Sequence, residues 1–215
     1  MKLCYSFDSR IDTFQTIEML KSSMEQSKTY GYEIVFYGDS NSIDELKDSY
    51  DSAVDITHCN FQFRDEIKMY IHSKEDLDCV TIDSNILLGE PIDLSYASVW
   101  FLDKEHTERY KEMLEHFHKH GTEYHIHGFK QFSNTFVNMN LLKFNDEGVK
   151  EDLLRAYEQL KGFYLEVIEP EETLSEKGWD MSKILSEYYF GCLLEYNEIN
   201  SAYLSDDHVF KINSN

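Results

Sequence analysis

Short apolar runs alternate with segments of helical periodicity through the first 85 residues. Four apolar runs have the length and composition of buried strands, and they lie at residues 2–7, 33–37, 53–57 and 79–82. The segments between them place apolar side chains three and four positions apart, as amphipathic helices do, and they lie at residues 13–27, 43–50 and 64–73. Strands that alternate with helices predict parallel strands joined by crossover helices, a Rossmann-like unit.

Two of these predicted helices begin with a capping-box pattern. In such a box, two side chains three positions apart each accept a hydrogen bond from the backbone N–H of the other residue. The pairs are Asp12 with Gln15 and Ser42 with Glu45. The pattern therefore predicts where the first and second helices begin.

After residue 83 the pattern changes. The predicted elements that follow a loop at 89–91 are a strand at 97–102, a helix at 105–120, strands at 123–127 and 135–144, a helix at 150–161, a strand at 163–168 and a helix at 181–196. The polar tail, 197–215, either wraps the domain or closes over a site. Because the chain contains no internal repeat and no linker, we expect one α/β domain with a mixed, mostly parallel sheet flanked by helices.

Charge and composition exclude several classes of function. The 215 residues include 20 Lys and Arg against 41 Asp and Glu, a formal net charge of −21, which repels a nucleic-acid backbone. No run approaches the roughly 20 apolar residues that cross a bilayer, and the N-terminus lacks the features of a signal peptide. The four cysteines are far apart and lack zinc-type spacing, which indicates reduced core residues. We expect a cytoplasmic protein that does not bind nucleic acid.

The most informative segment is 77–85, an apolar strand that ends in Asp83 and, two residues later, Asn85. In an open α/β sheet the ligand crevice lies at the carboxyl ends of the strands. Asp83 and Asn85 could there hold Mg²⁺ or Mn²⁺, which take oxygen ligands and would bridge to a diphosphate. Asp, Ser and Asn are also common turn formers, so a plain turn is the alternative interpretation.

Two motifs carry a resemblance to a known family. The order of the elements and the segment Asp83-Ser84-Asn85 resemble the nucleotide-sugar-dependent glycosyltransferases of the GT-A fold, whose motif is Asp-x-Asp. The segment 138–145, Asn-Met-Asn-Leu-Leu-Lys-Phe-Asn, resembles the Asn-Ala-Gly-Val-Leu-x-Phe-Asn strand that lines the acceptor side in that family. The resemblance spans roughly residues 1–200. It implies a nucleotide-binding half, 1–85, and an acceptor-side half with the C-terminal tail, 86–215.

The resemblance also implies site residues. The implied cofactor-binding positions, which would contact the nucleotide-sugar or line the acceptor side, are Phe7, Asp8, Asp39, Asn138 and Asn140. Phe7 also fits a buried strand position. A late histidine often completes the metal sphere in this family, so the implied ligands of Mn²⁺ or Mg²⁺ are Asp83, Asn85 and His208, although His208 also fits a solvated tail. Among 41 acidic residues the catalytic base is not assignable, and Asp180 and Glu187 are candidates in name only.

Both motifs depart from the family pattern. Asn85 stands in place of the second aspartate, and Asn140 stands in place of the glycine that lets an acceptor approach the backbone. An asparagine oxygen can still bind a metal ion, but the weaker electrostatics lower the affinity. Two hypotheses follow. The first is a glycosyltransferase-like protein that transfers sugar from a nucleotide-sugar to an unknown acceptor; the second is a catalytically inactive GT-A-like acidic module that binds a protein partner or a second copy in a larger assembly.

A cluster of histidines gives a third, weaker hypothesis. Five histidines lie within residues 116–127, at positions 116, 118, 120, 125 and 127. Helical spacing pairs His116 with His120, and strand spacing pairs His125 with His127, so each pair could chelate a transition metal. The competing interpretation, which we favour, is a solvated helix end, where histidine complements the helix dipole.

Overall fold

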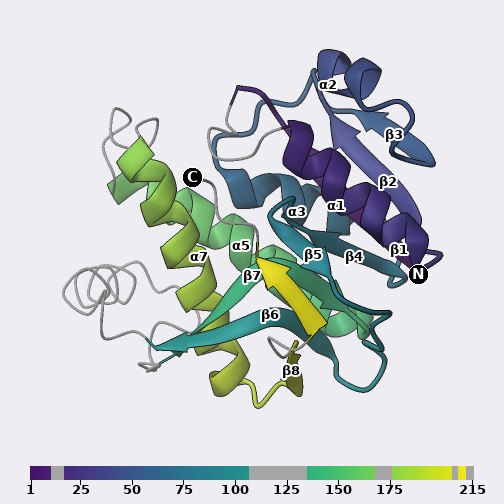
Figure 1. The fold of residues 1–215 in the computed structure, drawn as a ribbon. Helices are drawn as coiled ribbons and strands as arrows, with labels where there is room; N and C mark the ends of the chain where they lie inside the picture. The colour runs from purple at the N-terminus through teal and green to yellow at the C-terminus, as the bar shows by residue number, and fades with distance from the viewer. Residues whose placement is uncertain (11–16, 107–134, 168–175, 205–207, 212–215) are drawn as a thin grey trace.

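The computed structural model of the chain describes residues 1–10, 17–106, 135–167, 176–204 and 208–211, and its fold is shown in Figure 1. The strands are β1 Lys2–Phe7, β2 Glu33–Gly38, β3 Ser52–Asp55, β4 Cys79–Ile82, β5 Ile86–Leu88, β6 Val99–His106, β7 Thr135–Phe144, β8 Ser201–Tyr203 and β9 Val209–Lys211. The helices are α1 Ile17–Thr29, α2 Ser40–Glu45, α3 Arg64–Lys74, α5 Glu147–Val167 and α7 Glu176–Tyr196.

Seven strands form one mixed sheet in the order β3-β2-β1-β4-β7-β6-β8, and β5 and β9 form a separate antiparallel pair. β3, β2, β1 and β4 run parallel to one another. β7 is antiparallel to both β4 and β6, and β8 is parallel to β6. This confirms the predicted α/β fold with a mixed, mostly parallel sheet.

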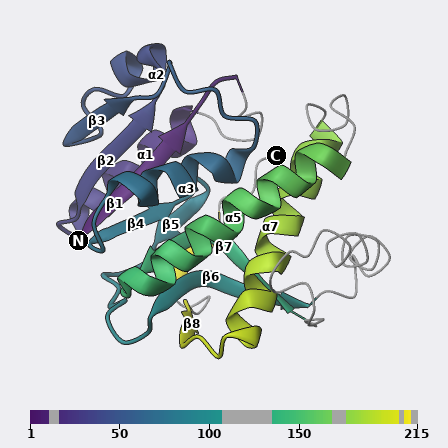
Figure 2. The ribbon, with the colours of Figure 1, turned by 180° about the vertical axis from the view of Figure 1, so that it is seen from behind.

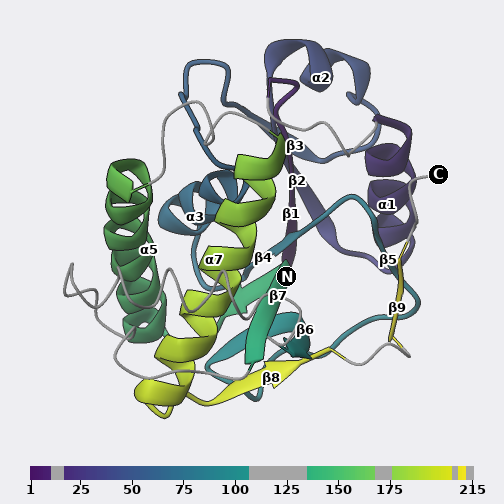
Figure 3. The same cartoon turned by 90° about the vertical axis from the view of Figure 1, so that its left-hand side faces the viewer.

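Helices cover both faces of the sheet. α1 and the β5-β9 pair lie on one face, and α3, α5 and α7 lie on the other, as Figures 2 and 3 show from behind and from the side. The alternation of β1 reflects this arrangement, because Tyr5 packs on the α1 side while Cys4 packs with Ile67 of α3. β1 is therefore buried on both faces, as a central parallel strand must be.

Three strands have the bounds that the sequence predicts: β1, β4 and β7. The start of α2 differs from its prediction. Asp39 is the N-cap, and its Oδ1 accepts a hydrogen bond from the N–H of Ser42 at 3.0 Å, so Ser42 lies inside the helix and the predicted capping box of Ser42 with Glu45 is wrong. The other predicted box, Asp12 with Gln15, lies outside the described residues.

Two further predictions are wrong. The predicted strand at 163–168 is the end of α5, because Tyr157, Leu160 and Tyr164 continue the helical spacing and bury their side chains in the same core. The helix predicted from residue 105 overlaps β6, which continues to His106. The rest of that helix, the strand predicted at 123–127 and the histidine cluster lie outside the described residues.

The C-terminal segment wraps the domain, one of its two predicted roles. It adds β8 to the edge of the main sheet and β9 to β5, two strands that the sequence pattern did not predict. All four cysteines are free, and Cys4, Cys79 and Cys192 are buried as expected. Among the described helices, none is both long and apolar enough to span a membrane.

One titratable group in the core makes stability depend on pH. His72 of α3 is fully enclosed between Thr81, whose hydroxyl lies 3.1 Å from Nε2, and the ring of Phe144. Burial, with a smaller contribution from the positive charge of Lys150, lowers the pKa of His72 to about 3. Between pH 6.5 and that value the unfolded chain binds a proton that the folded chain does not, so stability falls as the pH falls.

We therefore expect the variant His72→Gln to lose less stability than the wild type on acidification. A shift of one pKa unit corresponds to about 1.4 kcal/mol, so the histidine accounts for about 2 kcal/mol of the loss between pH 7 and about pH 5. Urea unfolding of both proteins at the two pH values measures this difference. Equal losses in the two proteins would contradict this, because they would show that folding does not change the proton binding of His72 in this pH range.

Candidate functional site

An aspartate stands at the carboxyl end of each of the four parallel strands. Asp8 follows β1, Asp39 follows β2, Asp55 is the last residue of β3 and Asp83 follows β4. Because these strands are parallel neighbours, the four carboxylates lie along one edge of the sheet, which we call the carboxyl edge. Among the described residues, Arg10 pairs with Asp8 and Lys68 pairs with Asp83.

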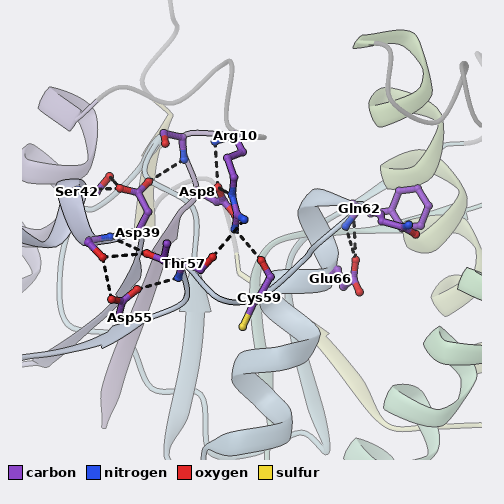
Figure 4. Close-up of polar contacts among 12 residues, drawn as sticks. Asp8, Arg10, Asp39, Ser42, Asp55, Thr57, Cys59, Gln62 and Glu66 are labelled. Carbon is purple, nitrogen blue, oxygen red and sulfur yellow. Dashed lines mark hydrogen bonds and ion pairs between the residues drawn. The ribbon is translucent and has the colours of Figure 1, made fainter.

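Asp8 and Arg10 form a clamp between two loops, shown in Figure 4. The Nε and Nη2 atoms of Arg10 donate to the two carboxylate oxygens of Asp8 at 2.7 and 2.5 Å, and Asp8 is fully buried. The same guanidinium donates to the carbonyl of Cys59 at 2.9 Å and to that of Thr57 at 3.4 Å. This bidentate pair ties the loop after β1 to the loop that precedes α3.

Asp39 holds the start of α2 against the loop after β1 (Figure 4). Its Oδ1 accepts from the N–H and the hydroxyl of Ser42, and its Oδ2 accepts from the N–H of Ser9 at 3.0 Å. Burial opposes the charged form, but these hydrogen bonds outweigh it and lower the pKa of Asp39. The carboxylate is therefore ionised at neutral pH and engaged by the protein itself.

Asp55 has the same kind of role at the end of β3. Its carboxylate accepts from the N–H of Thr57 at 2.8 Å and from the hydroxyl of Ser40 at 2.9 Å. The side chain of Thr57 lowers the pKa of Asp55 most, followed by the Thr57 N–H and the Ser40 hydroxyl. The loops at the ends of β1, β2 and β3 are thus fixed to one another by side chains of the carboxyl edge.

Asp83 takes part in a buried ion pair. The Nζ of Lys68 lies 2.8 Å from Asp83 Oδ1, and both side chains are under 5% exposed, at 3% and 4%. Lys68 also donates to the carbonyl of Met139 at 2.8 Å and lies 3.7 Å from Asp65 Oδ1. The hydroxyl of Ser186 donates to Asp65 Oδ2 at 2.7 Å. One ammonium thus joins α3 to the end of β4 and to β7, and Asp65 extends the network to α7.

The two motif segments meet at this ion pair. The N–H of Asp83 donates to the carbonyl of Asn140 at 2.8 Å, and the N–H of Asn140 donates to Oδ1 of Asn138 at 2.9 Å. Between them, the N–H of Met139 donates to Glu187 Oε1 of α7 at 2.9 Å. The structure therefore brings together Asp83, Asn138 and Asn140. The side chain of Asp180 lies outside the described part of α7.

Several buried polar atoms beside this network have no hydrogen-bond partner among the described residues. They are Gln62 Oε1 and Asp65 Oδ1 at the start of α3, and Ser84 Oγ and Asn85 Oδ1 after β4. Buried polar atoms are almost always hydrogen-bonded, to protein or to another molecule. Two of these four atoms, Ser84 Oγ and Asn85 Oδ1, lie at the carboxyl end of β4.

Phe7 and His208 do not join this group. Phe7 is buried in the core on the α1 side of the sheet. His208 pairs with Glu90, with 2.5 Å between Nδ1 and Oε1, and its carbonyl accepts from the N–H of Gly89. β5 runs along α1 and away from the carboxyl edge. The carbonyl of Ile86, at its start, accepts from Ser23 within α1, and the carbonyl of Gly89, after its end, accepts from Tyr30 beyond the end of α1. His208 thus lies at the far end of β5 from Asp83.

The described residues do not fit the metal site that the sequence predicts. A divalent ion at Asp83 would have to sit beside the ammonium of Lys68, which already holds Oδ1 of that carboxylate. His208 lies elsewhere, and Asn85 supplies one neutral oxygen. Within the described ranges, no three His, Cys, Asp or Glu side chains are grouped closely enough to hold a metal ion.

Sequence reasoning missed Lys68, Asp65 and Arg10. A signal for the first two exists, because Asp65, Lys68 and His72 share one face of α3 by their spacing of three and four. That face meets β4 and β7, where charged side chains are costly unless paired. Arg10 carries no such signal, because its partners on the loop before α3 lie 47 and 49 residues away in the chain.

Comparison with known proteins gives distant structural likenesses. No protein-family model and no curated protein sequence matches the chain. Mouse xyloside xylosyltransferase 1 matches with a TM-score of 0.47 and 11% identity over 95% of this chain and 84% of that one. The CTP:phosphocholine cytidylyltransferase of Streptococcus pneumoniae matches with 0.48 and 11% over 99% and 93%. A nucleoside-diphosphate-sugar pyrophosphorylase of Vibrio cholerae matches with 0.49 and 8% over 97% and 94%.

Glycosyltransferases and nucleotidyltransferases are thus among the proteins whose structures this chain resembles. The likenesses are too distant to establish a family or a function by themselves, since the TM-scores lie below 0.5.

We expect Lys68→Met to lower the free energy of unfolding by about 3–5 kcal/mol, because it leaves Asp83 and Asp65 buried without their cation. The double variant Lys68→Met with Asp83→Asn should recover part of the loss. The control is Lys21→Met, which removes an exposed lysine that lies 3.9 Å from Glu25 and should change stability little. Urea unfolding checks all three variants. Equal effects of Lys68→Met and Lys21→Met would contradict a buried ion pair.

Proposed function

We propose that the chain binds a nucleotide-sugar at the carboxyl edge and transfers the sugar to an acceptor. The observation that supports this best is the 2.8 Å hydrogen bond from Asp83 N to the Asn140 carbonyl. It joins the two segments that resemble donor-side and acceptor-side motifs of GT-A glycosyltransferases. The unpartnered Ser84 Oγ and Asn85 Oδ1 follow directly in the chain. A donor sugar bound at this edge would lie next to both segments.

The chemistry of the edge suits the uncharged parts of such a ligand. Asn85 is half-buried, and its Oδ1 would accept from a sugar or ribose hydroxyl once the side chain turns toward the ligand, which satisfies an atom that is otherwise buried without a partner. The diphosphate is the part of the ligand least suited to this edge, because the four aspartates repel its negative charge. Among the described cations, Arg10 is best placed to contact the diphosphate, since about half of its side chain is exposed while its guanidinium pairs with Asp8.

A second function is favoured by a different observation. Asp8, Asp39, Asp55 and Asp83 are each held by groups of the protein itself, as a scaffold requires. This supports a catalytically inactive module of the same fold that binds a protein partner or a second copy through its acidic surface. The two functions differ in turnover: a transferase releases nucleoside diphosphate from the bound donor, whereas an inactive module does not.

We expect one class of UDP-, GDP-, ADP- or CMP-linked sugar to raise the melting temperature of the protein, because a ligand that binds only the folded state stabilises it. Asn85→Ala should lower the affinity for that ligand by about tenfold, which corresponds to about 1.4 kcal/mol of binding free energy. Asn197→Ala, at an exposed asparagine beyond α7, is the matched control. Calorimetric titration gives the affinities, and release of nucleoside diphosphate gives turnover. If no sugar nucleotide stabilises the folded protein, the transferase proposal fails.

The metal requirement has its own test. We expect the wild type to bind the same sugar nucleotide with similar affinity in EDTA and in Mn²⁺, because Lys68 already neutralises Asp83. Asn85→Asp adds a carboxylate oxygen and should raise the affinity for Mn²⁺ by about tenfold in a calorimetric titration. Tight binding of Mn²⁺ by the wild type that Asp83→Asn abolishes would instead restore the metal site that the sequence predicts.

A further inference from the structure

The exposed cation of the carboxyl edge has few hydrogen-bond donors left for a ligand. Of the two described cations that contact its aspartates, the Arg10 side chain is 46% exposed and the Lys68 side chain is 3% exposed. An arginine side chain carries five N–H groups. In Arg10, Nε and Nη2 use three of them on the two oxygens of Asp8 and on the carbonyl of Cys59, at 2.7, 2.5 and 2.9 Å. The two N–H groups on Nη1 are the remaining ones.

The remaining donors of Arg10 sit on a single atom. One N–H of Nη1 contacts the carbonyl of Thr57 at 3.4 Å, the longest of the hydrogen bonds that the guanidinium makes. The other has no acceptor among the described residues. The paired face of Nε and Nη2, which binds a carboxylate or a phosphate in bidentate fashion, is already occupied by Asp8. Arg10 can therefore contact the oxygens of one phosphate group through Nη1.

The chain's own carboxylates occupy two other places where a phosphate could bind. Backbone N–H groups at the start of a helix attract anions. At the start of α2 this position is filled by the N-cap, Asp39. At the start of α3, Glu66 Oε2 accepts from the N–H of Gln62 at 2.8 Å, and Glu66 Oε1 pairs with Lys161. A second phosphate would have to displace one of these carboxylates.

A second phosphate would also meet an exposed negative charge. Asp55 is exposed, and its pKa is lowered, most of all by the side chain of Thr57, so the carboxylate is ionised at neutral pH. It accepts from the N–H of Thr57 at 2.8 Å, and the carbonyl of the same residue is the one that Nη1 of Arg10 contacts. Figure 4 shows these side chains together. A diphosphate, with more negative charge than a monophosphate, is repelled more strongly there.

We propose that the carboxyl edge holds a nucleotide through one phosphate group, and so prefers donors whose sugar is joined to a nucleoside monophosphate over those joined to a nucleoside diphosphate. This inference rests on the proposed function and names its donor class. The one phosphate accepts from Nη1 of Arg10. A second phosphate adds negative charge but reaches no further unpaired cation or open helix start among the described residues, so it adds no affinity. CMP-linked sugars have one phosphate, whereas UDP-, GDP- and ADP-linked sugars have two.

The test compares the nucleotide parts of the two donor classes. The wild type is titrated calorimetrically in EDTA with the monophosphates and the diphosphates of uridine, cytidine, adenosine and guanosine. For the nucleoside that binds, we expect the diphosphate to bind no more tightly than the monophosphate. A diphosphate that binds threefold or more tightly than its monophosphate overturns the inference and leaves the proposed function standing. If none of the eight nucleotides binds, the proposed function fails, and the inference fails with it.

Two variants test the contacts themselves. Arg10→Lys keeps a positive charge beside Asp8, so it should fold, but it removes Nη1. It should weaken the monophosphate and the diphosphate by the same factor, about tenfold, because both use the same single contact. A loss confined to the diphosphate would show that Arg10 contacts the second phosphate, and would overturn the inference.

Asp55→Asn removes the exposed negative charge and should raise the affinity for the diphosphate relative to the monophosphate by about threefold. Asp76→Asn is the matched control. Asp76 is also exposed and also accepts from the N–H two residues later, that of Asp78 at 3.1 Å, but it precedes β4 and so lies at the opposite end of the strands. This control should leave the ratio of the two affinities unchanged. Equal ratios in Asp55→Asn and Asp76→Asn would contradict repulsion of a second phosphate by Asp55.

Discussion

The ion pair between Lys68 and Asp83 is the interaction on which the arrangement of this protein depends. It lies under 5% exposed where α3, the end of β4, β7 and α7 converge. Removing two charges from water is expensive, so a buried pair adds little net stability but penalises any arrangement that separates its partners. The pair therefore acts as a constraint on geometry: the loop after β4 and the backbone of Met139 keep one relative position.

The same principle organises the rest of the carboxyl edge. Three more aspartates end three more parallel strands, and the hydrogen bonds of each fix a loop. A binding site needs loops that are already in place, because ordering them on binding would cost affinity. The carboxylates of this edge thus contribute rigidity, whereas Ser84 Oγ and Asn85 Oδ1 have no partner among the described residues.

The sequence predicts the elements well where one local pattern decides the structure. β1 and β4 are short and mostly apolar, and their bounds are correct. Prediction fails in two places. The Phe163–Tyr164 pair has strand propensity but packs in the core as part of α5, and α2 is capped by Asp39, three residues before Ser42. That Asp83 lies close to Asn138 and Asn140 follows from the sheet topology, because β4 pairs with β7. Lys68 and Arg10 have partners that only the folded chain reveals, and His208 is placed by the pairing of β9 with β5.

The position of β8 also affects how the chain folds during synthesis. This strand comes from residues 201–203, yet it pairs with β6, whose residues leave the ribosome about a hundred positions earlier. β4 likewise pairs with β7 only after residue 143 has been synthesised, because Val80 lies opposite Lys143. The nascent chain can assemble β1, β2, β3 and β4 early, because all four lie before residue 83, but it leaves the outer edge of β6 unpaired until the last segment emerges. Until then β6 is an unpaired edge strand, and such an edge can pair with other chains.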